Sequence, residues 1–217
     1  MGFPKNFVWG VASSSYQVEG AWNRDGKGLS VWDTYVHEPG HIQNQDTGDT
    51  ACDQYGHIKE DIALMAEMQI KAYRFSISWP RVMPEGTGRI NQKGLDYYDR
   101  LTDQLLDGIT PYITLFHWDL PYQLYTKGGW MNRDITDYFA AYAETVVNRL
   151  SDRVKYWITE NEPQCYIGAA LASGEHAPGL KLGKKELFLA AHHSLLAHGK
   201  AVEAIRSCAK QASVIGY

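Results

Sequence analysis

Two glutamates stand on either side of one asparagine in the stretch WITENEP, residues 157–163. An apolar run that reads as a strand leads directly into them, and Pro163 closes the stretch. A carboxylate is costly to bury without a partner, and acids that lie in clefts often transfer protons. Two interpretations of Glu160 and Glu162 therefore stay open. Either both lie on a solvated loop, or at least one does acid/base chemistry at the end of a buried strand.

Two further polar positions lie beside apolar runs. His117 and Trp118, in HWDLP, follow the run 112–116, and Arg74 lies inside the run 72–77. Parallel sheets place their sites at the carboxyl ends of the strands, so His117 and Trp118 are candidates for a site; a packed aromatic loop is the alternative. A charge inside a strand must be paired, most simply with a carboxylate. Arg74 is therefore either half of a structural ion pair or part of a site.

Motifs for other chemistries are weak in this sequence. EGTGR, residues 85–89, lacks the spacings of phosphate-binding loops and is interpreted as a turn. His192, His193 and His198 lack the spacing of four that places two metal ligands on one helical face, so AHHSLLAHG is interpreted as a structural helix. The sequence also lacks the GxSxG motif of serine hydrolases.

The elements that must position these residues follow from alternating apolar runs and amphipathic segments. Apolar residues at helical spacing follow Asp53, Asn91 and Asp134, and a longer helix is predicted from Glu186 to about Arg206. Near-continuous apolar runs predict five strands, at residues 7–12, 72–77, 112–116, 156–159 and 212–215. This alternation predicts an α/β fold with a parallel sheet and right-handed crossovers. A barrel of eight such units needs about 250 residues, and four units use nearly the whole of this chain.

Composition narrows the class of protein. The chain has 217 residues, of which 44% are hydrophobic, which suits a single domain, and its interspersed charges sum to −4, which argues against a nucleic-acid partner. Cys52, Cys165 and Cys208 lie far apart and are odd in number, which favours free thiols in a reducing cytoplasm. No signal peptide or membrane-spanning stretch is predicted. Seven Trp and fourteen Tyr indicate either a large aromatic core or a sugar-binding site.

Seven stretches, in order along nearly the whole chain, resemble family 1 glycoside hydrolases of the β-glucosidase type. They are FVWGVASSSYQVEGAW, KEDIALM, AYRFSISWPR, TLFHWDLP, GGWMNRD, TENEP and HHSLLAHG. The resemblance implies a TIM (β/α)8 barrel, of which residues 1–217 form the N-terminal half: about four βα units and the start of strand 5. It also implies cleavage of β-glycosides with retention by two glutamates, without a metal or an organic cofactor.

The resemblance assigns roles to six residues. TENEP matches the family's acid/base motif, so Glu162 is expected to be the acid/base and Asn161 to bind the sugar 2-hydroxyl. Arg74, in YRFSISW, matches an arginine that lies near the nucleophile and holds it ionised. The residues that match the family's glycone-binding positions are Gln17, His117 and Trp118.

The second carboxylate of a retaining enzyme is not expected from this chain. The family's nucleophile belongs to an (I/V)TENG motif that lies in the second half of its members, whereas retention needs two carboxyl groups about 5–5.5 Å apart. Glu160 stands where the family usually carries an apolar or small residue, so it is expected to be a buried or rim-exposed structural variation. An ionised Glu160 near Glu162 would raise the pKa of Glu162.

Two functions stay open on the sequence. In the first, the chain is the acid/base half of a β-glycosidase and needs a complementary C-terminal half. In the second, it is an inactive half-barrel that binds sugar weakly through Gln17, His117 and Asn161 or serves as an assembly module. A half-barrel has two open sheet edges and an apolar inner face, so the isolated chain is expected to associate with a complementary half or with its own copies.

Overall fold

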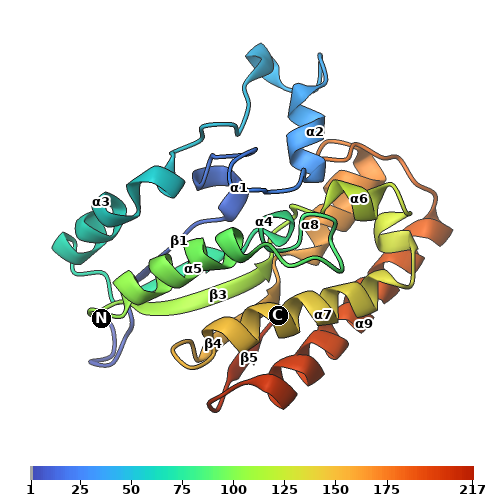
Figure 1. The fold of residues 1–217 in the computed structure, drawn as a ribbon. Helices are drawn as coiled ribbons and strands as arrows, with labels where there is room; N and C mark the ends of the chain where they lie inside the picture. The colour runs from blue at the N-terminus through green and yellow to red at the C-terminus, as the bar shows by residue number, and fades with distance from the viewer. Residues whose placement is uncertain (1) are drawn as a thin grey trace.

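The computed structural model describes residues 2–217, in which five parallel strands form one sheet (Figure 1). The strands pair in chain order, each with the next. They are β1 (Gly10–Ala12), β2 (Ala72–Ser76), β3 (Thr110–Phe116), β4 (Tyr156–Glu160) and β5 (Val214–Gly216). All five predicted strands are therefore present, in the order and direction expected of consecutive βα units of a barrel. The first is shorter than predicted and begins at Gly10 instead of residue 7.

Four long helices connect the strands and pack against one face of the sheet (Figure 1). They are α3 (Gln54–Glu67), α5 (Gln92–Leu105), α7 (Ile135–Leu150) and α9 (Lys184–Cys208). Each lies where the apolar spacing predicted a helix. In α5 the buried residues Leu95, Tyr98, Leu101 and Leu105 recur every three or four positions, which gives the helix one core-facing side. Asn91 precedes α5 as predicted, but its amide donates to backbone carbonyls of other segments and does not cap the helix.

The shorter elements gather where the strands end (Figure 1). In the long connection between β1 and β2, helix α2 (Val31–His37) begins with a capping box made by Ser30 and Asp33. The other short helices are α1 (Ser15–Val18), α4 (Trp79–Val82), α6 (Tyr122–Tyr125) and α8 (Pro163–Ile167), with the single turns η1 (Gln43–Gln45), η2 (Gly129–Met131) and η3 (Gly168–Ser173). The segment 85–89 is a turn, as predicted. These elements frame the carboxyl edge of the sheet.

The two faces of the sheet differ in how deeply their side chains are buried. Tyr73, Phe75, Ile113, Leu115 and Trp157 are buried beneath the long helices and form the main core. The opposite face carries a row of residues in register from β1 to β5 that are half-buried or exposed: Ala12, Arg74, Tyr112, Tyr156 and Val214. This second face corresponds to the inner face that a barrel would enclose.

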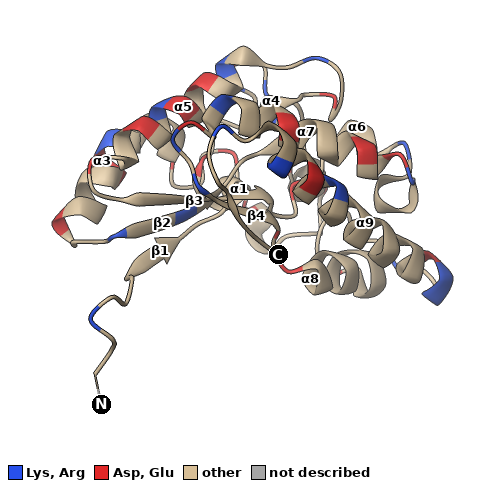
Figure 2. Ribbon diagram, turned by 90° about the horizontal axis from the view of Figure 1, so that it is seen from below, with Lys and Arg blue, Asp and Glu red and all other residues tan. Residues whose placement is uncertain are grey.

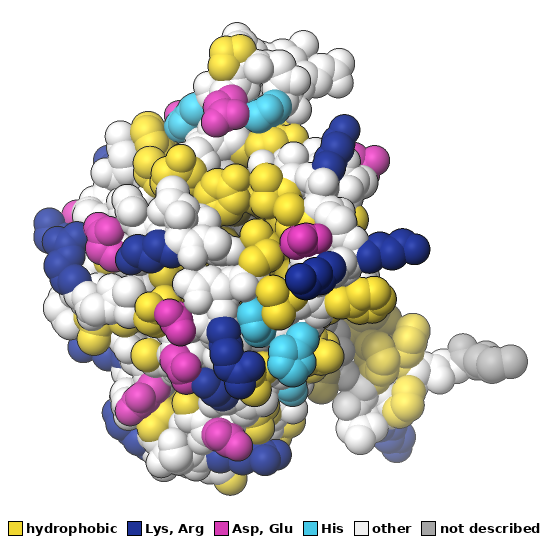
Figure 3. Space-filling model, turned by 90° about the vertical axis from the view of Figure 1, so that its right-hand side faces the viewer, with side chains coloured by type: hydrophobic (Ala, Val, Ile, Leu, Met, Phe, Trp, Pro, Cys, Tyr) yellow, Lys and Arg dark blue, Asp and Glu magenta, His cyan; other side chains and the backbone are white. Residues whose placement is uncertain are grey.

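Exposed aromatic rings cluster next to the β1 edge. Phe3, Phe7 and Trp9 are 65%, 44% and 54% exposed, and their ring centroids lie 4.5–4.7 Å apart. This N-terminal segment stands away from the rest of the chain (Figures 2 and 3). At the other end of the sheet, Phe188 and Leu195 of α9 are also exposed.

Charged residues of both signs are spread along the outer helices (Figure 2). Arg149 of α7 and Arg153, in the turn after it, form ion pairs with Asp96, Asp99 and Asp103 of α5. Over residues 2–217, none of the helices combines the length and the apolar character needed to cross a bilayer.

Candidate active site

The predicted site residues come from four neighbouring parts of the chain. Arg74 lies in β2, His117 and Trp118 follow β3, and Asn161 and Glu162 follow β4. Because parallel strands end at the same edge of a sheet, these residues meet there. Gln17 belongs to α1, which follows β1 at the same edge.

Asn161 lies at the centre of this group. Its side-chain Oδ1 accepts a hydrogen bond from Nη2 of Arg74, and its Nδ2 lies 3.2 Å from Nε2 of His117. Its backbone carbonyl accepts a hydrogen bond of 2.9 Å from Nε1 of Trp118, and its backbone N–H donates to the carbonyl of Phe116. With only 7% of its surface exposed, Asn161 is held in one orientation by β2 and by the loop after β3.

The imidazole of His117 is neutral over the ordinary pH range. The pKa of His117 is lowered to about 4, first by burial and then by the positive charge of Arg74, while the charge of Glu162 acts in the opposite direction. A neutral imidazole can accept at Nε2, which is the role that the amide of Asn161 requires. Among the contacts within residues 2–217, Nδ1 of His117 is buried and has no hydrogen-bond partner.

Glu162 is exposed at the start of α8. Its backbone adopts the left-handed conformation, with φ 49° and ψ 65°, which costs an L-residue roughly 1–2 kcal/mol. Trp118 also has a positive φ, of 75°. Two of the nine non-glycine residues with a positive φ in the described chain therefore lie on adjacent loops of the site, where the surrounding structure must hold the backbone.

Arg74 does not have the carboxylate partner that was expected for a charge inside a strand. Its Nε donates to Oγ1 of Thr114 at 2.9 Å and its Nη2 to Asn161, and no Asp or Glu of the described chain forms an ion pair with it. Burial lowers the pKa of Arg74, and the charge of Glu162 opposes this shift. Arg74 is half-buried on the inner face of the sheet, so its charge is available to a group that approaches that face.

A cavity of about 260 Å³ opens beside these residues. Its lining combines residues that were predicted with others that were not: Ser14, Tyr16, Gln17, Trp32, His117, Trp118 and His176. The rings of Trp32 and Trp118 both lie next to His176, with centroids 5.7 and 5.4 Å from the imidazole. Aromatic faces with a few polar groups at their rim are suited to the C–H faces and hydroxyls of sugars.

Tyr16, Trp32 and His176 were missed on the sequence. The abundance of Trp and Tyr indicated aromatic walls, but it did not say which residues form them. These three residues come from α1, α2 and the loop after η3, and only the folded chain brings them together.

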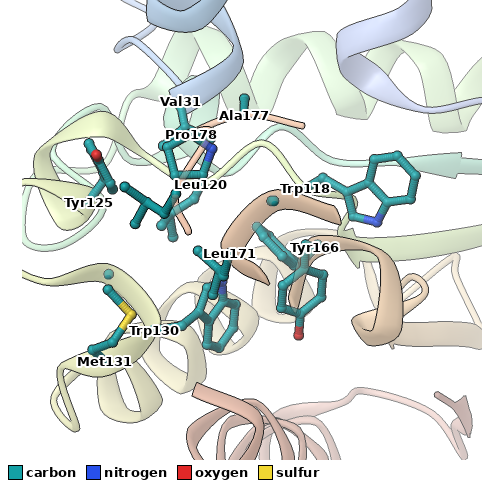
Figure 4. Close-up of a pocket in the computed structure, with 14 residues that line it drawn as sticks. Val31, Trp118, Leu120, Tyr125, Trp130, Met131, Tyr166, Leu171, Ala177 and Pro178 are labelled. Atoms are coloured by element: carbon teal, nitrogen blue, oxygen red, sulfur yellow. The ribbon is translucent and has the colours of Figure 1, made fainter. Parts of the chain in front are cut away.

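Behind Trp118 lies a second, much smaller pocket (Figure 4). It holds about 20 Å³, room for roughly one water molecule, between apolar side chains that include Leu120 and Leu171. The rings of Trp130 and Tyr166 are stacked there with centroids 5.3 Å apart. This pocket is part of the core that supports the site.

Glu160 was expected to be either buried or exposed at the rim of the site, and it is buried. Its side chain is fully buried, and its Oε2 accepts hydrogen bonds from the hydroxyls of Tyr166 and Ser194, the latter at 2.8 Å. Oε1 has no partner within residues 2–217. Burial disfavours the charged form and raises the pKa of Glu160 to about 7, although the two hydrogen bonds act in the opposite direction.

The histidines of AHHSLLAHG lie on α9, as the structural interpretation predicted. His193 is buried and its Nδ1 bonds to the carbonyl of Trp130, while Nδ1 of His198 lies 2.7 Å from Oγ1 of Thr159. Two of the three imidazoles therefore fix α9 to its neighbours.

Comparisons with known proteins agree with this geometry. The model of the family described as "Glycosyl hydrolase family 1" matches residues 1–217. Beta-glucosidase A of Acetivibrio thermocellus is 55% identical over 205 residues, which make up 94% of this chain and 46% of that protein. Beta-glucosidase A of Thermotoga maritima is 51% identical over 213 residues, 98% of this chain and 48% of that protein.

Solved structures give the same result. The structure of the Thermotoga maritima β-glucosidase in complex with glucoimidazole superposes with a TM-score of 0.95 at 51% identity, over 98% of this chain and 48% of that one. The chain thus spans about half the length of the curated relatives it matches. Its five strands and their helices are part of a TIM barrel of this kind.

Proposed function

Because this chain belongs to glycosyl hydrolase family 1, we propose that it supplies the acid/base half of an enzyme that hydrolyses β-glycosides with retention. Its relatives are β-glucosidases by name, which supports a β-glucoside as the substrate. In this proposal, residues 1–217 are the N-terminal unit of the barrel, and the nucleophile comes from outside them. The observation that carries it is the exposed carboxyl of Glu162 beside an asparagine fixed by Arg74 and His117.

Glu162 performs two proton transfers in this mechanism. It first protonates the glycosidic oxygen as the leaving group departs, and it then removes a proton from the water that hydrolyses the glycosyl-enzyme intermediate. Its exposure at the carboxyl edge of the sheet leaves room for an aglycone and then for a water. The left-handed backbone of Glu162 supports this role, because strain of this kind is retained where function requires it.

Asn161 orients the sugar through the 2-hydroxyl. Its Oδ1 and one N–H are engaged by Arg74 and His117, so its second N–H is the group that can donate to the sugar. Gln17, His117 and Trp118 bind the glycone in the cavity that they line together.

Arg74 supports a nucleophile that another part of the protein or another chain provides. A carboxylate that approaches the inner face beside Arg74 is held ionised by the guanidinium, because an opposite charge nearby lowers a carboxyl pKa. The partner is a complementary C-terminal half-barrel. The half-buried inner face and the exposed rings of Phe3, Phe7 and Trp9 support the existence of a covering partner.

A non-catalytic function is the second candidate. The cavity beside Gln17 and His117 is already formed within this chain, which favours weak sugar binding without any second half. The same exposed aromatic rings favour a role in assembly. We also propose a cytoplasmic location, which is supported by the free thiols of all three cysteines.

The decisive experiment measures hydrolysis of an aryl β-glucoside and of a β-linked disaccharide. The chain is assayed alone and after mixing with the separately produced C-terminal half of a family 1 relative. We expect activity only in the mixture. We expect Glu162→Gln to lower kcat/KM by about 10²–10⁴-fold, most strongly for the disaccharide, whose leaving group needs protonation more. Glu203→Gln, on the exposed side of α9, is the matched control and leaves the rate unchanged.

Two results would argue against the catalytic proposal. If the mixture that contains Glu162→Gln hydrolyses both substrates at the full rate, Glu162 is not the acid/base. If no mixture is active but the chain binds glucose in a titration, and loses that binding with His117→Ala, the non-catalytic function is favoured.

A further inference from the structure

One hydrogen bond joins the two ends of the turn that carries Glu162. The hydroxyl of Tyr166, in α8, donates to Oε2 of Glu160, the last residue of β4. Ser194 of α9 donates to the same oxygen at 2.8 Å, and its Oγ lies 2.7 Å from the hydroxyl of Tyr166. All three side chains are buried, at 0%, 4% and 1% exposure. A strand and two helices therefore meet at a single carboxyl group.

The turn between Glu160 and Tyr166 depends on such support. Glu162 has a left-handed backbone, which persists only where neighbouring structure holds it. Within the turn, the N–H of Cys165 donates to the carbonyl of Glu162 at 2.8 Å. The carboxyl of Glu162 itself is exposed, so its direction is set by the backbone on which it stands.

We propose that Glu160 is a positioning residue, which holds Asn161 and Glu162 in place by binding α8 through Tyr166 and α9 through Ser194. The proposal adds a positioning residue to the proposed function. It rests on that function in one respect: the fixed turn matters for catalysis because Glu162 is the proposed acid/base. Glu160 does not touch the substrate, because its side chain is fully buried behind the turn.

This contact is expected to weaken as the pH rises. The titratable groups that face Glu160 are Tyr166 of α8 and Tyr217 after β5, while α9 contributes the uncharged Ser194. No Lys, Arg or His of residues 2–217 forms an ion pair with it. In the closed turn the pKa of Glu160 is raised from 4.5 to about 7, whereas an opened turn exposes the carboxyl to water. The carboxyl of Glu160 therefore binds its proton more tightly in the closed turn than in the opened one. As a result, opening of the turn becomes easier as the pH rises from 4.5 to about 7.

Hydrogen exchange of the backbone amides at residues 164–168 tests the proposal without any assay of activity. Wild-type protein is compared with Glu160→Gln and Tyr166→Phe. The matched control is Tyr97→Phe, which removes a buried hydroxyl that has no partner in the described part of the chain. Exchange is followed by mass spectrometry from about pH 5 to about pH 8 and corrected for the intrinsic pH dependence of exchange.

In the wild type we expect the corrected protection to fall by up to about 100-fold between about pH 5 and pH 7 and then to level off. In Glu160→Gln this dependence is expected to vanish, because the amide does not titrate. Tyr166→Phe should lower protection by about five- to tenfold at low pH through loss of its hydrogen bond, and Tyr97→Phe should match the wild type.

Protection that is the same in all four proteins, or a wild-type profile without an inflection near pH 7, would overturn the proposal. A local effect in this segment supports it even if the chain proves inactive with every complementary half. The positioning role and the catalytic role can therefore fail separately.

Discussion

Glu160 and Glu162 are separated by one residue, yet their carboxyl groups occupy opposite environments. Glu162 is exposed at the mouth of the site, and Glu160 is fully buried beneath it. The change of direction occurs at the end of β4, where the backbone enters the left-handed conformation at Glu162. The two acids of WITENEP thus differ in role: Glu162 faces the solvent of the site, and Glu160 holds the turn.

Replacing Glu160 with Gln is expected to change the pH dependence of stability. A carboxyl whose pKa is raised by folding stabilises the folded state fully below its unfolded value of 4.5, and this contribution is lost as the pH rises to about 7. The rise of the pKa from 4.5 to about 7 corresponds to about 3 kcal/mol in the free energy of unfolding. Glu160→Gln should therefore show a flatter slope over this window in urea unfolding, measured at several pH values. An unchanged slope would show that Glu160 titrates normally.

His117 is expected to stay uncharged well below neutral pH. Its pKa of about 4 follows from burial and from the charge of Arg74. NMR of the imidazole nitrogens should show the neutral ring at pH values where an unperturbed histidine, with a pKa of about 6.5, is protonated. The resonance of His117 is assigned by its loss in His117→Gln. A titration near the ordinary value of 6.5 would contradict the neutral acceptor role toward Asn161.

At the scale of elements, the short helix α1 illustrates how the site is fixed. Four residues cannot form a stable helix alone, and α1 carries Gln17 into the cavity. It is held at its end by Glu19, whose carboxylate accepts from Nε of Arg81 at 2.8 Å and from the hydroxyl of Tyr98 at 2.6 Å. At its start, Oγ of Ser15 donates to Asp119. A buried ion pair between α1 and α4 thus supports a sugar-binding position.

Removing Glu19 is expected to be costly, because it leaves Arg81 buried without a counter-charge. Glu19→Ala should lower the free energy of unfolding by about 3–5 kcal/mol, as measured in urea. Glu67→Ala, at the exposed end of α3, is the matched control and should cost little. A loss below about 1 kcal/mol for Glu19→Ala would mean that Arg81 finds other partners or water.

At the scale of the whole molecule, the sheet has two outer strands, β1 and β5, that each pair on one side only within residues 2–217. Unpaired strand edges readily bind other strands. Phe3, Phe7 and Trp9 lie beside the first edge, and Val214 and Tyr217, at 50% and 51% exposure, lie at the second. Apolar surface is therefore concentrated at the two ends of the sheet.

The isolated chain is expected to associate at micromolar concentration. Light scattering after size exclusion should show species larger than one chain, and the triple change Phe3→Ser, Phe7→Ser and Trp9→Ser should shift the distribution toward the monomer. Leu64→Ser with Met68→Ser, which removes two exposed apolar residues from α3, is the control and should have less effect. A sharp monomer peak with cooperative thermal unfolding in the unchanged chain would contradict this expectation.

Much of the architecture could be predicted from the sequence because the signals are local. Apolar runs and helical spacing predicted all five strands and the four long helices, and the motifs predicted that Arg74, His117 and Asn161 share one site. The boundary of the first strand differs from the prediction. The run 7–12 contributes only three residues to β1, because Phe7 and Trp9 pack against Phe3 and not into the sheet.

Sequence by itself determined the family and the order of the elements, since both depend on motifs and patterns of residues close together in the chain, and it proposed Glu162 as the acid/base. Only the tertiary structure decided three further points. It placed Tyr16, Trp32 and His176 around one cavity, gave Arg74 an amide instead of a carboxylate as its partner, and buried Glu160 between Tyr166 and Ser194. These depend on contacts between segments far apart in sequence, where packing and not local pattern sets which side chains meet and how strongly water is excluded from them.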